Sequence, residues 1–219
     1  MRGWCHIMEL KKMKFIDLFA GIGGFRYALE SFGCKCVFSS EWDKYCQESY
    51  NLNFGEIPYG DITKIDEKDI PSFDILCAGF PCQPFSISGK QKGFEDTRGT
   101  LFFDIVRIVS YHKPKIIFLE NVKNLKAHNG GATFEVISNT LDSLNYNIYY
   151  KVLNAKDFNL PQNRERITIV CIRKDIDNEE FKFPEPSKKF VTISDIKEDD
   201  SITEKYLLKR KDIHIDEKK

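Results

Sequence analysis

Short apolar runs alternate with helix-like patterns along most of this 219-residue chain, and this alternation constrains its fold more than any other feature. Apolar runs bounded by turn residues are typical of buried strands of a parallel sheet, and the longer amphipathic segments between them are typical of connecting helices. The predicted order is strand 14–19, helix 25–31, strand 36–40, helix 44–52, strand 73–78, helix 101–111, strand 116–119, helix 133–144, and strands 148–153 and 167–172. This order predicts an α/β fold with a doubly wound, mainly parallel sheet.

Three parts are predicted along the chain. Residues 1–13 show no packed pattern and are expected to be a lead-in, whereas residues 14–174 carry the strands and helices. Residues 175–219 are rich in charge, which is typical of a linker or of the start of another domain. The 33 basic and 33 acidic side chains balance, so no global positive field indicates a nucleic acid. No apolar run reaches the roughly 20 residues that span a bilayer, so a soluble protein with no membrane partner is expected.

The seven cysteines are odd in number and irregular in spacing. Cys34 and Cys36 are too close together for the usual zinc pair, and no C-x-x-C occurs, so no metal site is predicted. This pattern is typical of a protein of the reducing cytoplasm whose thiols are mostly buried.

One cysteine stands in an unusual setting. Cys82 lies between Pro81 and Pro84, shortly after the apolar run 73–78. Proline lacks the amide donor and clashes with a preceding helical turn, so Cys82 fits neither a helix interior nor a central strand. It is therefore predicted on a stiff loop past the carboxyl end of a strand, where open α/β sheets bind their ligands. The alternative is a small, inert residue in a turn.

A glycine-rich segment follows the first predicted strand. Gly21, Gly23 and Gly24 would let ligand atoms approach backbone amides, although such a segment also occurs as a tight strand-to-helix turn. Glu41, at the end of the second strand, can accept from ribose hydroxyls, and Trp42 can stack on an adenine. The segment lacks the phosphate-binding Gly-Lys-Ser/Thr pattern. A cofactor with ribose and adenine but no pyrophosphate fits best, which indicates S-adenosylmethionine.

Polar residues also lie beside other predicted strands. Asp61, on its own loop, can bind the adenine amino group or simply form a turn. Glu120 directly follows an apolar strand and is either a solvated strand terminus or a catalytic acid. Arg164 and Arg166 precede the last predicted strand, in a segment that also fits an exposed charged turn. A thiol, a carboxylate and an arginine pair at one sheet edge suit chemistry on a pyrimidine.

Four segments, in this order, resemble the motifs of the DNA cytosine-5 methyltransferases. They are Asp-Leu-Phe-Ala-Gly-Ile-Gly-Gly-Phe at 17–25, Gly-Phe-Pro-Cys-Gln-Pro-Phe-Ser at 79–86, Glu-Asn-Val at 120–122 and Gln-Asn-Arg-Glu-Arg at 162–166. The resemblance runs from about Lys14 to Arg210. It implies the Rossmann-like fold of the S-adenosylmethionine-dependent methyltransferases, and methyl transfer from S-adenosylmethionine to carbon 5 of a cytosine in DNA.

The resemblance implies a covalent mechanism. Cys82 resembles the nucleophile, which would add to carbon 6 of the ring so that carbon 5 attacks the sulfonium methyl, and a nearby cation would favour its thiolate. Glu120 would hydrogen-bond ring nitrogen 3 and the exocyclic amine, best in its protonated form. Arg166, with Arg164 near it, would hold the carbonyl oxygen of the base and the acidic groups.

The remaining implied contacts are with cofactor and DNA. The residues implied in cofactor binding are Phe19, Ala20, Gly21, Gly23, Gly24, Glu41, Trp42, Asp61, Ile62, Pro81 and Leu101. Asn121 and Val122 would shape the base pocket. Because the target carbon lies inside a stacked duplex, the base must flip out, and the segment 86–100 resembles a mobile lid. The implied DNA contacts are Gln83, Ser86, Ser88, Lys90, Lys92 and Arg98, with Ser88 entering the space that the base vacates.

Family members continue into a variable target-recognition region and a last motif that completes the cofactor pocket. The chain ends before either, so full activity is expected to depend on a missing segment or on a second polypeptide. Double-stranded DNA is the expected partner, in agreement with eight basic against four acidic side chains in residues 79–126. The role would be in restriction-modification, in phage defence or as an orphan enzyme.

Three rival functions have some basis in the sequence. A zinc cytosine deaminase also flips bases, but its H-x-E and P-C-x-x-C signatures do not occur here. A tRNA cytosine-5 methyltransferase would share the family motifs. An inactive or regulatory DNA-binding remnant would use the fold only to bind. Covalent trapping on DNA that contains 5-fluorocytosine distinguishes an enzyme from a binder.

Overall fold

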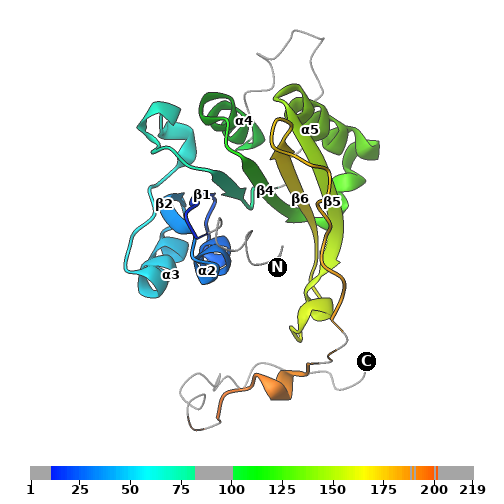
Figure 1. Cartoon of the computed structure of the whole chain (residues 1–219). Helices are drawn as coiled ribbons and strands as arrows, with labels where there is room; N and C mark the ends of the chain where they lie inside the picture. The colour runs from blue at the N-terminus through cyan, green and yellow to red at the C-terminus, as the bar shows by residue number, and fades with distance from the viewer. Residues whose placement is uncertain (1–10, 82–100, 188, 190, 200, 202–219) are drawn as a thin grey trace. The chain divides into compact units, whose positions relative to one another are not determined.

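The computed structural model describes residues 11–81, 101–187, 189, 191–199 and 201 (Figure 1). The chain divides into two compact units. The first, here called the sheet unit, comprises the chain up to Leu153 together with Glu165–Pro184. The second, here called the small unit, comprises Asn154–Arg164 and the chain from Glu185 onward.

A six-stranded sheet in the order β2-β1-β3-β4-β6-β5 forms the centre of the sheet unit. The strands are β1 (Lys14–Leu18), β2 (Lys35–Ser40), β3 (Ile75–Ala78), β4 (Ile116–Val122), β5 (Tyr146–Asn154) and β6 (Glu165–Arg173). β1 pairs in parallel with β2 and with β3, and β3 pairs in parallel with β4, whereas β6 runs antiparallel to β4. The predicted α/β class with a mainly parallel sheet is confirmed, and the reversal at β6 is an addition to it.

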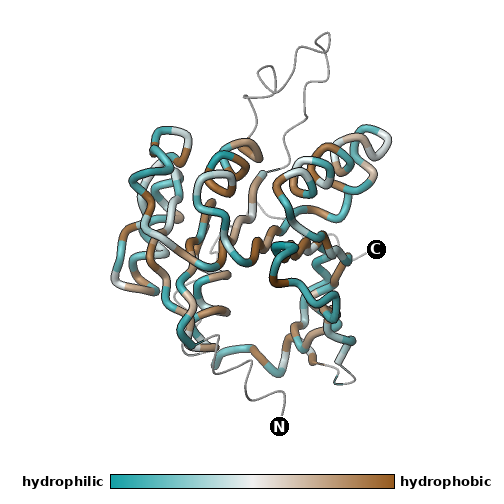
Figure 2. Tube along the Cα trace, turned by 45° about the horizontal axis from the view of Figure 1, so that its top comes forward, coloured by the Kyte–Doolittle hydropathy of each residue, from teal (hydrophilic) through white to brown (hydrophobic). Residues whose placement is uncertain are grey.

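Helices cover both faces of this sheet. They are α2 (Gly24–Ser31), α3 (Lys44–Phe54), α4 (Leu101–His112) and α5 (Ala132–Ser143), with short 3-10 helices at Ile62–Lys64 (η1), Glu67–Asp69 (η2), Lys123–Lys126 (η3), His128–Gly131 (η4), Ala155–Phe158 (η5) and Ile193–Asp195 (η6). α4 and α5 pack on one face around Ile105 and Ile137, which form the larger core, and α2 packs on the other through Phe25 and Leu29. Apolar residues concentrate in the strands and alternate with polar residues along the helices (Figure 2).

Local chemistry fixes where the two helices near β1 begin and end. α3 begins at Asp43, whose side chain accepts from the backbone N–H groups of Tyr45 and Cys46 at 2.9 Å each, and it ends at Gly55 with φ 70°. α2 ends before Gly33, whose φ of 84° suits glycine. The loop between β1 and α2 lies against the last residues of α3, where Asn53 Nδ2 donates to the backbone carbonyl of Ile22 at 3.1 Å.

Candidate active site

The glycine loop, Phe19–Gly23, turns the chain sharply from β1 into α2. Phe19, Gly21 and Gly23 have φ values of 56°, 55° and 92°, in the left-handed region that glycine adopts most readily. A Cβ on Gly23 would lie 2.1 Å from the ring of Phe54 on α3, so the loop packs against that helix without a side chain. Gly21 and Gly24 instead face open space. The loop is therefore closed toward α3 and open at Gly21.

Glu41 joins this loop to the end of β2. Its side chain is almost fully buried, Oε2 accepts from the backbone N–H of Gly21 at 2.8 Å, and Oε1 accepts from the backbone N–H of Asp43 at 2.9 Å. A carboxylate has about four lone-pair sites, so these two hydrogen bonds leave acceptors for a ligand hydroxyl. The neighbouring indole of Trp42 is 80% exposed. The contact between Glu41 and Gly21 was not predicted from the sequence.

Asp61 forms a turn. It caps η1, with Oδ1 accepting from the backbone N–H of Thr63 at 3.1 Å and from its hydroxyl at 2.8 Å. These hydrogen bonds lower the pKa of Asp61 below its usual value. The structure confirms the turn-forming interpretation, and a contact between Asp61 and a ligand stays a prediction. Of the other predicted cofactor residues, Ala20 and Ile62 are buried, Leu101 is half-buried and Pro81 is exposed.

A carboxylate and a guanidinium meet where β4 and β6 lie side by side. Glu120 Oε1 lies 2.9 Å from Arg166 Nε, and Arg166 Nη1 donates to the backbone carbonyl of Glu165 at 2.8 Å. Both side chains are about one-third exposed. Gly79, just past β3, faces this pair, since a Cβ there would lie 3.6 Å from Glu120 Oε2. The acid and the cation thus meet beside Gly79, three residues before Cys82 in the sequence.

The structure changes one detail of this arrangement. The sequence predicted that β4 ends at Leu119, so that Glu120 follows the strand, but β4 continues to Val122. The reason is the antiparallel partner, because the pairing of β4 with β6 extends to Val122 opposite Arg166. Glu120 is therefore held in the sheet by β6, where it pairs with Thr168, one residue beyond the end of the β3 ladder.

The other predicted catalytic residues and the predicted DNA contacts rest on the sequence alone. Arg164 belongs to the small unit, where its backbone N–H donates to Asn154 Oδ1 at 3.0 Å. Cys82 and all the predicted DNA-binding residues lie outside the described residues: Gln83, Ser86, Ser88, Lys90, Lys92 and Arg98. Their roles stay predictions.

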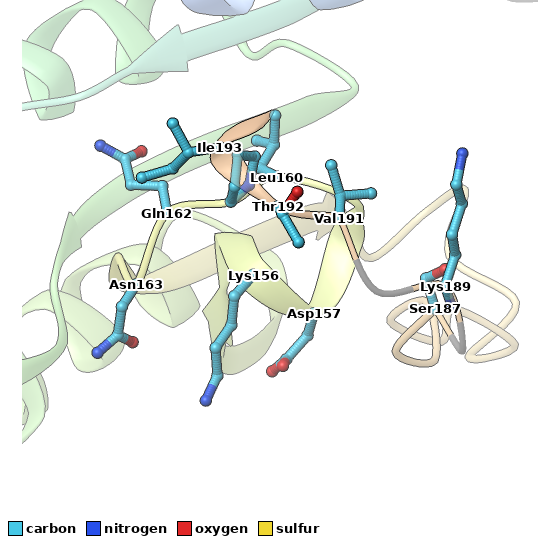
Figure 3. Close-up of a pocket in the computed structure, with 11 residues that line it drawn as sticks. Lys156, Asp157, Leu160, Gln162, Asn163, Ser187, Lys189, Val191, Thr192 and Ile193 are labelled. Atoms are coloured by element: carbon cyan, nitrogen blue, oxygen red, sulfur yellow. The ribbon is translucent and has the colours of Figure 1, made fainter. Parts of the chain in front are cut away.

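The small unit has a pocket of its own, of about 520 Å³ (Figure 3). It is lined by segments 156–163 and 187–193, among them Leu160 and Ile193, and by polar side chains such as Asp157 and Gln162. None of the predicted catalytic or cofactor residues is among the side chains that line it. Its lining nevertheless includes Gln162 and Asn163, the first two residues of the segment 162–166 that contains Arg164 and Arg166.

Asp17 is fully buried on β1, next to the glycine loop. Among the described residues, neither carboxylate oxygen has a hydrogen-bond partner of normal geometry. Burial raises the pKa of Asp17 well above its usual value, and the charge of Glu41 adds to this effect, whereas the backbone N–H and the charge of Arg26 oppose it. Folding therefore favours the protonated form of Asp17.

This burial predicts a pH dependence of stability. The folded chain binds the proton of Asp17 more tightly than the unfolded chain, so the free energy of unfolding should fall as pH rises above about 4, the unfolded pKa, toward the raised one. Asp17→Asn removes this titration without changing the shape of the side chain. Between pH 4 and pH 8 we expect the free energy of unfolding of the original chain, measured by urea unfolding, to fall by about 1–3 kcal/mol more than that of the variant. Equal decreases in the free energy of unfolding would show that other groups offset the cost of burying the ionised carboxylate.

Comparison with solved structures identifies the class of fold. The structure resembles a putative DNA modification methyltransferase encoded within an E. coli prophage, with a TM-score of 0.66 and 24% identity over 84% of this chain and 54% of that one. It also resembles the S. pombe Dnmt2 methyltransferase, with a TM-score of 0.61 and 24% identity over 84% of this chain and 55% of that one. The fold is therefore the α/β fold of methyltransferases.

Comparison of sequences identifies the family. A model of C-5 cytosine-specific DNA methylases matches residues 13–219. The chain is 58% identical over 205 residues to the Type II methyltransferase M.HhaI of Haemophilus parahaemolyticus and 58% identical over 193 residues to M.HaeII of Haemophilus aegyptius. These alignments cover 94% and 88% of this chain but 63% and 60% of the relatives, so the chain spans about three fifths of their length. The chain belongs to the C-5 cytosine-specific DNA methylase family.

Proposed function

We propose that this chain carries the catalytic part of an enzyme that transfers a methyl group from S-adenosylmethionine to carbon 5 of a flipped-out cytosine in DNA. The observation that carries the proposal is the ion pair between Glu120 and Arg166, 2.9 Å apart and adjacent to Gly79, three residues before Cys82 in the sequence. An acid and a cation beside a nucleophile are the groups that addition to a pyrimidine ring needs. Family membership supports the same chemistry.

The residues around the glycine loop fit the cofactor. Gly21 faces open space, Glu41 keeps unused acceptors, and the exposed indole of Trp42 offers a flat apolar surface. In this proposal the loop backbone and Glu41 hold the amino acid and ribose parts, Trp42 stacks on the adenine, and Asp61 accepts from its amino group. When bound, S-adenosylmethionine supplies an electrophilic methyl group.

Cys82, Arg166 and Glu120 have separate roles in the reaction of the base. Cys82 adds as a thiolate to carbon 6, and the guanidinium of Arg166 stabilises negative charge at this end of the sheet and holds the base's carbonyl oxygen. Glu120 hydrogen-bonds ring nitrogen 3 and the exocyclic amine. Loss of the proton from carbon 5 then releases Cys82. The relatives' Type II names favour a restriction-modification role in the cytoplasm, with a further segment or a partner chain selecting the DNA site.

Covalent trapping tests this proposal. Incubated with S-adenosylmethionine and duplex DNA that contains 5-fluorocytosine, the chain should form a complex that survives denaturation, because fluorine cannot leave as a cation from carbon 5. Peptide mapping should place the base on Cys82, and ordinary cytosine should give no trapped complex.

The assay needs two further arms. The chain is tested alone and together with a polypeptide that supplies a target-recognition region, because it covers only part of its relatives. Trapping in neither arm, or on a residue other than Cys82, would refute the proposed function. Transfer to tRNA but not to duplex DNA would favour the tRNA-methylating alternative.

Among the described residues, no helix is both long and apolar enough to cross a membrane.

A further inference from the structure

We infer that Asn121 is a positioning residue: its side chain fixes the backbone immediately before Cys82, so that the nucleophile is presented to the base. The inference rests on the proposed function and assigns a role to a residue that does not itself touch the base. It arises from a hydrogen bond between β4 and the segment that follows β3.

Asn121 points to the opposite face of the sheet from Glu120. Successive side chains of a strand alternate between faces, and β4 follows this rule. Leu119 and Asn121 are both buried, at 0% and 3% exposure, and Leu119 belongs to the larger core beside α4 and α5. Glu120, between them, is about one-third exposed and pairs with Arg166. The Asn121 side chain therefore lies on the core side of β4, and its expected part in shaping the base pocket stays a prediction.

The amide of Asn121 continues the pairing of β3 with β4 beyond the last backbone ladder. That ladder ends with Ala78 beside Leu119. Two residues further on, Asn121 Nδ2 donates to the backbone carbonyl of Phe80 at 2.8 Å, in a buried hydrogen bond between residues 41 apart in sequence. Asn121 Oδ1 accepts from the backbone N–H of Val122 at 2.8 Å, which orients the amide. The Asn121 side chain thus holds the segment after β3 in place beyond the point where the backbone pairing of β3 with β4 ends.

Phe80 is anchored a second time through its ring. The ring is buried in the larger core and lies 5.8 Å from that of Phe102 on α4. With its ring and its carbonyl both held, the peptide plane between Phe80 and Pro81 has little freedom. Pro81 then fixes its own φ near −65°, so only one backbone torsion separates the anchored plane from Cys82.

Only an amide satisfies both partners of this arrangement. Phe80 presents an acceptor and Val122 presents a donor, so the side chain at 121 must donate at one end and accept at the other. Aspartate would place an acceptor against the buried carbonyl of Phe80, and alanine would leave that carbonyl without its donor. Both changes free the Phe80–Pro81 plane without touching Glu120 or the glycine loop.

The test compares Asn121→Asp and Asn121→Ala with a matched control, Asn147→Ala. Asn147 Nδ2 also makes a 2.8 Å hydrogen bond, to Asp177 Oδ2, on β5 away from the site. Single-turnover trapping on 5-fluorocytosine DNA should slow about 10- to 100-fold in both Asn121 variants, because small misplacements of a reacting group have effects of this size. Dissociation constants for S-adenosylmethionine and DNA should stay within about twofold. The control should trap at the unchanged rate.

Hydrogen exchange at the backbone amides of Gly79 and Phe80 gives a second readout that does not need activity. These amides should exchange faster in Asn121→Ala than in the original chain or in Asn147→Ala, relative to amides of β1. If the original chain is not trapped, the proposed function fails, and exchange alone decides on the anchoring role. Unchanged trapping with unchanged exchange would overturn the inference, and so would a loss of trapping fully explained by weaker binding of cofactor or DNA.

Discussion

Arg166→Ala is expected to lower the single-turnover rate of methyl transfer by about 100- to 1,000-fold, the usual effect of removing one charged donor that stabilises a transition state. Arg166 Nε pairs with Glu120 at 2.9 Å, and Nη1 is held by the carbonyl of Glu165. Alanine leaves Glu120 without its partner and removes the cation of the pair that faces Gly79, just past β3. Transfer of a radiolabelled methyl group from S-adenosylmethionine to DNA measures the effect.

Arg173→Ala is the matched control, because Arg173 lies on the same strand, has the same 27% side-chain exposure and pairs with Asp175 at 2.7 Å. It should change the rate by less than about twofold, since surface ion pairs of this kind contribute little. Arg166→Lys keeps the charge but loses the planar fork, so its rate should fall between those of the alanine variant and the original chain. A normal rate in Arg166→Ala would remove the guanidinium from the mechanism.

Gly23→Ala is expected to destabilise the fold by about 2–5 kcal/mol. A left-handed backbone costs an alanine about 1–2 kcal/mol, and overpacking adds about 1–3 kcal/mol. The φ of Gly23 is 92°, and its Cβ would lie 2.1 Å from Phe54 Cε2 and 3.1 Å from Tyr50 Cε2. Tyr50 is fully buried, and the Arg26 guanidinium lies over the Phe54 ring at 4.6 Å, so the rings have little room to move. Urea unfolding measures the loss.

The same loop provides two controls. Gly24 is the first residue of α2 and faces open space, so Gly24→Ala should be neutral or stabilising by up to about 1 kcal/mol. Gly21 also faces open space but has a φ of 55°, so Gly21→Ala should cost only the backbone term of about 1–2 kcal/mol. If Gly23→Ala were no worse than Gly21→Ala, the packing of the loop against α3 would not be tight.

Much of the fold is predictable from local patterns, because residues that become buried in a strand or a helix face recur at a regular spacing in the sequence. The apolar run of β3 and the amphipathic pattern of α4 place both elements within two residues of their observed bounds. The antiparallel direction of β6 cannot be predicted in this way, since a buried strand has a similar composition in either direction. The underestimated length of β4 has the same origin, because its last three residues are held by β6.

The candidate site is predictable from the sequence only for residues that belong to a local motif. Glu120 and Arg166 were expected at one edge of the sheet, and the structure brings them into contact, although their roles and that of Cys82 stay predictions. The bonds from Glu41 to Gly21 and from Asn121 to Phe80 join residues 20 and 41 apart, and no local pattern reports such distances. A polar residue on the inward side of β4, in line with Leu119, was the available signal for Asn121.

The adjacency of Glu120 and Asn121 makes β4 intolerant of a change in length. One residue faces the ion pair and the next faces the core, so inserting or deleting a single residue upstream in the strand would exchange their directions. The carboxylate would then be driven into an apolar interior and the amide turned toward solvent. Point substitutions at the exposed Val122 leave this order intact. A change in the length of this strand is therefore expected to be more disruptive than a change in the identity of an exposed side chain along it.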